Sequence, residues 1–73
     1  MRRDEAVAIR MDLLRLNLVC SAQIDLKDSE QGFDVVIQGD YKLNQIRLFA
    51  IANDLELQLD KEKGTCRIHN PDY

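Results

Sequence analysis

One pattern occurs twice in this chain of 73 residues, about thirty-three residues apart, and it restricts the possible folds more than any other feature. In each copy, a segment with helical periodicity precedes two segments that alternate with the period of a β-strand. Because one helix and one hairpin cannot bury their apolar faces alone, the pattern predicts that the two copies pack together. The apolar positions that match between the copies are Leu13/Ile46, Leu16/Phe49, Leu18/Ile51, Ile24/Leu57, Leu26/Leu59, Phe33/Cys66 and Val35/Ile68.

The order of these segments predicts an α+β domain of αββαββ order, with a four-stranded, mostly antiparallel sheet and both helices on one face. The whole chain, residues 1–73, is expected to form this single domain. The predicted elements are a helix at 4–19, a hairpin at 22–38, a helix at 41–53 and a hairpin at 55–69, with an irregular or disordered tail at 70–73. Asp40 is expected to cap the second helix, and Asn53 to end it in a left-handed conformation. The repeat fits either a duplication or two units under the same packing rules.

The small size of the chain favours a partner. A domain of this length buries only about 60% of the surface that its unfolded chain exposes, and such domains often depend on disulfides, a metal or another subunit. The two cysteines have no close pairing motif, and charged residues follow Met1 where a secretory signal needs an apolar run. We therefore expect a cytoplasmic protein with reduced thiols, stabilised by self-association.

The first predicted helix carries two apolar stripes, although a helix lying on one sheet needs only one. The first stripe is Val7, Met11, Leu14 and Leu18, and the second is Ala6, Ile9, Leu13 and Leu16. We expect the first stripe to face the sheet. The second is the predicted partner or dimer interface, unless the helix at 41–53 covers it within one chain.

The chemistry-bearing residues do not form a recognisable catalytic or metal-binding constellation. His69 is the only histidine, and the spacing of Cys20 and Cys66 matches no zinc motif, so both cysteines are expected in the core. No phosphate-binding glycine motif occurs. The carboxylates of the predicted strands, which are Asp25, Asp34, Glu56 and Asp60, are expected to form exposed charge pairs with Lys27 and Arg67 on a solvated outer face. The sequence therefore predicts no enzyme activity, no cofactor and no metal.

The function expected from these observations is that of a small non-enzymatic protein-interaction module, a homodimeric accessory or regulatory protein that also binds another protein. The alternative is a nucleic-acid-binding regulator. It would use the basic residues of the helical layer, which are Arg2, Arg3, Arg10, Arg15, Lys42 and Arg47. The net charge of −3 disfavours tight sequence-independent binding, which depends on clustered cations. A third reading is a small enzyme or ligand-binding subunit whose site, near His69, lies at a dimer interface.

Overall fold

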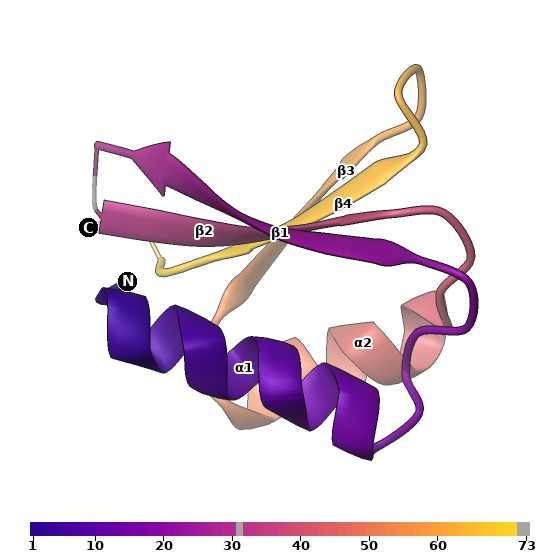
Figure 1. Ribbon diagram of the computed structural model, residues 1–73, viewed down its shortest axis with the longest axis horizontal. Helices are drawn as coiled ribbons and strands as arrows, with labels where there is room; N and C mark the ends of the chain where they lie inside the picture. The colour runs from indigo at the N-terminus through magenta and orange to yellow at the C-terminus, as the bar shows by residue number, and fades with distance from the viewer. Residues whose placement is uncertain (31, 72–73) are drawn as a thin grey trace.

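The computed structural model describes residues 1–30 and 32–71, and these form two layers, a sheet above a pair of helices (Figure 1). The elements are α1 (Arg3–Arg15), β1 (Gln23–Ser29), β2 (Gly32–Gln38), α2 (Leu43–Ala52), β3 (Glu56–Asp60) and β4 (Thr65–His69). The predicted αββαββ order and the four-stranded sheet are confirmed, and every strand pairing is antiparallel. Of the predicted tail, residues 70 and 71 have no regular structure, and residues 72–73 lie outside the described residues. Among the described residues, no helix is long and apolar enough to cross a membrane.

The sheet arranges the two halves of the chain about an approximate two-fold axis. Its strand order is β1-β2-β4-β3, so the first strand of each hairpin is at an edge and the second is in the centre. In the central ladder, Val35 pairs with Ile68, its matched position in the sequence repeat, and both side chains are fully buried. The axis therefore passes between these two residues. A duplication and shared packing rules would both produce this arrangement.

Both helices end in the same motif, and its position corrects two predicted boundaries. After α1, Asn17 has a φ of 57°, and the Leu18 N–H donates to the Leu13 carbonyl. After α2, Asp54 has a φ of 55°, and the Leu55 N–H donates to the Ala50 carbonyl. This is the Schellman motif, which stops a helix because the left-handed residue turns the chain away. The first helix accordingly ends at Arg15 rather than at residue 19, and the left-handed exit is Asp54 rather than Asn53.

The connections also differ from the prediction in two places. The helix α2 begins only at Leu43, and its N-cap is Lys42, which makes no side-chain cap. The predicted cap Asp40 instead accepts the Cys20 N–H with its backbone carbonyl. The composition of residues 28–32 predicts a turn of about five residues in the first hairpin. The turn is tighter, because the strand pairing extends to Ser29 and Gly32.

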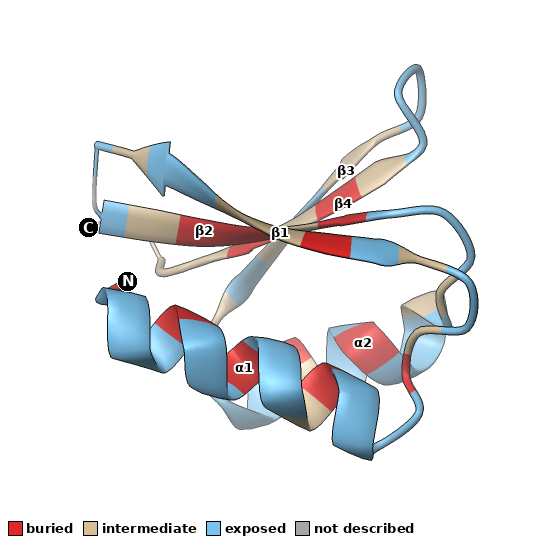
Figure 2. Ribbon diagram, viewed as in Figure 1, coloured by how far each residue is buried: buried red, intermediate tan, exposed pale blue. Residues whose placement is uncertain are grey.

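The core lies between the sheet and the helices, and Figure 2 shows buried positions on the sheet-facing side of both helices. The helix α1 packs against β2 and β1, and α2 packs against β3. The largest fully buried side chains come from both halves of the chain, namely Leu13, Ile37, Ile46, Ile68, Val35 and Cys66. Of these, Leu13 and Ile46 are matched positions of the repeat. Each helix thus contributes the same position to one shared core.

Candidate functional site

The two apolar stripes of α1 are placed in the opposite way to the prediction. Ala6, Ile9 and Leu13, expected at a partner interface, belong to the core, and only Leu16 of that predicted set is exposed. Of the residues expected in the core, Leu18 is buried, but Val7, Met11 and Leu14 are exposed instead. Helical periodicity separates two stripes but does not say which of them meets the sheet, because both are apolar and of similar width. The predicted interface at Ala6, Ile9 and Leu13 is therefore wrong.

The exposed apolar side chains of the described residues gather on the helical layer. We call Val7, Met11 and Leu14 the α1 patch, and Leu48 and Ile51 the α2 patch. Their exposed fractions range from 38% to 67%. Residues three or four apart are neighbours on a helix surface, so each patch is continuous along its helix.

The α1 patch adjoins an edge of the sheet. A shallow groove of about 290 Å³ runs between α1 and β1. Arg10 and Leu14 line it from the helix, Ala22 lines it from just before the strand, and residues 23–25 line it from the strand. Since β1 is an edge strand, the groove opens where the sheet has no further strand. An apolar helix flank and an unpaired strand edge therefore lie side by side.

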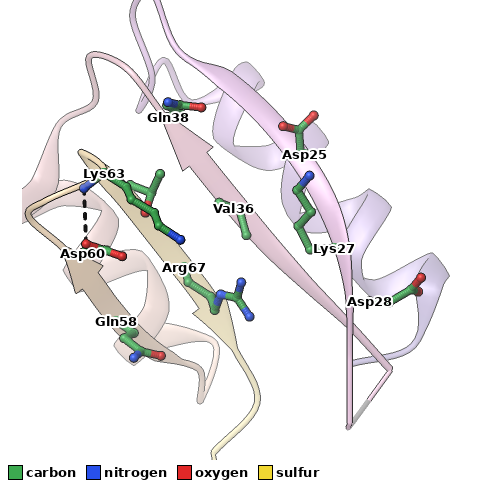
Figure 3. A pocket seen from close by; sticks show the side chains of 10 residues that line it. Asp25, Lys27, Asp28, Val36, Gln38, Gln58, Asp60, Lys63 and Arg67 are labelled. Carbon is green, nitrogen blue, oxygen red and sulfur yellow. Dashed lines mark hydrogen bonds between the residues drawn. The ribbon is translucent and has the colours of Figure 1, made fainter.

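The outer face of the sheet, away from the helices, is polar as predicted. A hollow of about 570 Å³ lies over this face, and Figure 3 shows its lining side chains. The lining includes three cationic and three anionic groups, which are Lys27, Lys63, Arg67, Asp25, Asp28 and Asp60. Asp60 accepts the backbone N–H groups of Glu62 and Lys63, at 3.1 and 3.2 Å, and so holds the β3–β4 turn. The balance of charge gives the hollow no preference for an anionic or a cationic ligand.

One carboxylate of this face is buried, which the sequence did not predict. The Asp34 side chain accepts a hydrogen bond from Arg67 Nη1 at 2.9 Å and another from Ser29 Oγ at 3.1 Å. Asp34 as a residue is 5% exposed, whereas the Arg67 side chain is 42% exposed. Arg67 thus covers the carboxylate and neutralises it, so the pair joins β2 to β4. The sequence predicts an exposed charge pair at Asp34, whereas its pair with Arg67 is partly buried.

The residues with potential catalytic or metal-binding chemistry are dispersed. The Nδ1 atom of His69 lies 2.8 Å from the Asn70 carbonyl oxygen, and since a carbonyl only accepts, Nδ1 carries the proton of this hydrogen bond. Among the described residues, no three His, Cys, Asp or Glu side chains could hold a metal ion together. Cys66 is in the core as predicted, and burial raises the pKa of its thiol to about 11, so the nucleophilic thiolate is disfavoured. Cys20, also expected in the core, is exposed instead.

The basic residues of the nucleic-acid alternative are all exposed, but they do not form one group on α1. Arg2 forms ion pairs with Asp4 and Glu5, at 3.9 and 3.6 Å. Arg15 forms an ion pair with Asp12 at 3.2 Å and points about 140° away from Arg10 around the helix. Neighbouring carboxylates therefore offset part of this positive charge. The other members of the predicted set, Arg3, Lys42 and Arg47, are exposed as well.

Comparison with known protein families, with curated proteins and with solved structures finds no match to this chain.

Proposed function

We propose that this protein is a small non-enzymatic interaction module whose contact surface is the apolar part of its helical layer. One observation supports the proposal above the others. The exposed large apolar side chains of the described residues all lie on the two helices or directly after α1, while the outer face of the sheet is polar. Clustered apolar exposure of this kind marks surfaces that bind other proteins.

Homodimerisation remains part of the proposal, with a corrected surface. The α1 and α2 patches replace the set Ala6, Ile9 and Leu13, which the core uses. The proposed setting is the cytoplasm, which the two free thiols support because they persist in a reducing compartment. Nucleic-acid binding is the less supported rival, since carboxylates are paired with Arg2 and Arg15.

The test is a sedimentation-equilibrium series from low to high micromolar concentration. We expect the average mass to rise toward that of two chains. A variant with glutamine at all five positions of the two patches should remain monomeric at every concentration while its circular dichroism is unchanged. A wild-type protein that associates no more than this variant contradicts the proposed homodimer. A gel shift at low salt with duplex DNA and single-stranded RNA tests the rival, which requires binding that weakens as salt rises.

A further inference from the structure

The strand β1 offers an open edge for another strand. It is seven residues long and occupies the end of the sheet, where its pairing is with β2. Proteins commonly protect such edges with proline, bulges, very short strands or charged side chains, and β1 has charged side chains but none of the backbone devices. Proline and glycine are absent from Gln23–Ser29, and its pairing with β2 is continuous from end to end. The backbone of β1 is therefore suited to strand addition.

The sequence of β1 is complementary to itself in one register. In a two-fold antiparallel pair with complete overlap, the axis passes through the central residue, Leu26. Asp25 then lies opposite Lys27 of the second copy, and Lys27 opposite Asp25. Figure 3 shows these two side chains next to each other along β1 on the outer face of the sheet. Opposite charges placed directly across an antiparallel pair stabilise it, and here the favourable pair occurs twice.

We propose that a second copy of this chain binds to β1 in this register, so that two sheets join into one and the α1 patches meet beneath the junction. The inference rests on the proposed function, since it names the partner and the binding mode of the α1 patch. The interface is isologous, because the same strand and the same patch serve both copies.

The opposite edge of the sheet does not have this complementarity. Complete overlap of β3 with its own copy centres on Gln58 and places Glu56 opposite Asp60 twice. Like charges directly across an antiparallel pair destabilise it. The strand β3 is also shorter, at five residues. Self-association by strand addition is thus favoured at β1 and disfavoured at β3.

The helical layer fits the same junction. Strands in a sheet lie about 4.8 Å apart, and α1 packs against β2 and β1. Two copies joined through β1 therefore place their α1 axes about 10–15 Å apart, within reach of side chains such as Leu14 that lie on the β1 side of the helix. The side chains of Val7 and Leu14 are then removed from water in both copies.

A charge-exchange experiment tests the register. Asp25→Lys alone puts lysines opposite lysines, and Lys27→Asp alone puts carboxylates opposite carboxylates, so each variant should dimerise about ten- to a hundredfold more weakly than wild type. An equimolar mixture of the two restores both opposite-charge pairs and should form a heterodimer with near wild-type affinity. Sedimentation equilibrium measures all four samples, and circular dichroism checks that each variant is folded.

Amide hydrogen exchange of the wild type provides a second test. It is needed because Lys27 also lies opposite Asp34 in the sheet, so the Lys27→Asp variant could fail to fold. Amides of β1 should gain protection as the protein concentration rises, and amides of β3 should not. Unchanged dimerisation of Asp25→Lys, or protection gained at β3 alone, overturns the inference. If polar substitution of Leu48 and Ile51 abolishes association while Asp25→Lys leaves it intact, the proposed function stands and the β1 junction is refuted. A wild type that stays monomeric at high micromolar concentration refutes the junction and the homodimer together.

Discussion

Two adjacent leucines of α1 should respond in opposite ways to the same substitution. Leu13 is 0% exposed and belongs to the core, whereas Leu14 is 53% exposed and belongs to the α1 patch. Leu13→Ala removes buried apolar volume and leaves a cavity, at a cost of about 2–5 kcal/mol. A domain of this size has a total stability of only about 4–11 kcal/mol. Leu14→Ala changes a half-exposed side chain and should cost less than about 1 kcal/mol in the monomer.

Urea unfolding followed by circular dichroism measures both effects, at a concentration low enough to keep the chain monomeric. With an m-value of about 1 kcal/mol per molar urea, Leu13→Ala should lower the midpoint by at least about 2 M or leave the chain unfolded in buffer. Leu14→Ala should lower it by less than about 1 M. Ile46→Ala, at the matched and equally buried position of α2, serves as the control and should resemble Leu13→Ala. A larger loss for Leu14→Ala than for Leu13→Ala refutes the placement of the two stripes.

Three further predictions concern the sheet and its connections. Arg67→Met leaves the buried Asp34 carboxylate without its cation and should lower the free energy of unfolding by about 2 kcal/mol. A hydrogen bond to a charged group contributes about 1.5–3 kcal/mol, and Arg67 is partly hydrated. Equal losses for Arg67→Met in the wild type and in an Asp34→Asn background would contradict an energetic coupling between the two side chains. Folding raises the pKa of the Cys66 thiol from 9.0 to about 11. The free energy of unfolding is therefore unaffected by this thiol below pH 9 and falls between pH 9 and 11, because the unfolded chain loses the proton first. Cys66→Val should remove this part of the pH dependence, and an identical pH profile for the variant would exclude the thiol as its cause. Gly39→Ala sets a Cβ 2.8 Å from the Ser21 carbonyl oxygen at a φ of 119°, whereas Gly64→Ala at a φ of 65° meets nothing within 4 Å; thermal unfolding should show a clearly larger loss for Gly39→Ala, and similar losses would show that the Ser21 contact is relieved cheaply.

The arrangement of elements could be predicted because local periodicity and the repeat point to the same fold. Alternation in 22–27 and 55–60 predicts half-buried strands. The apolar run at 46–52 predicts a helix buried on most sides, and this is wrong, because Leu48 and Ile51 are exposed. The strand order could not be predicted, because the residue pattern of a strand does not show which strands lie beside it. Only the repeat contained a hint, because Val35 and Ile68 are matched positions that also pair in the central ladder.

The candidate surface could not be placed from the sequence, because burial depends on which of two similar stripes meets the sheet. Ala6 and Leu13 pack closely against β2 and β1 in the fold, and nothing in the helix alone favours them over Met11 and Leu14. The burial of Asp34 escaped prediction for a related reason. Its cation, Arg67, is thirty-three residues away, and only the register between β2 and β4 brings the two together. One signal was present: Asp34 and Arg67 are also matched positions of the repeat, offset by the same interval as Val35 and Ile68.

The approximate two-fold axis of the sheet has a consequence for assembly size. It places β1 and β3 at equivalent edges, so a chain with two equally adhesive edges could add copies at both ends. Pairing of β1 with β3 would be head-to-tail and would leave a fresh edge after each addition, which is the geometry of an open fibre. The acidic residues Glu56 and Asp60 make one edge unlike the other. In the proposed β1 junction, growth beyond two chains would require β3 to pair with β3, which sets Glu56 opposite Asp60 twice, so the charges by which the two halves differ are expected to limit the assembly to a dimer.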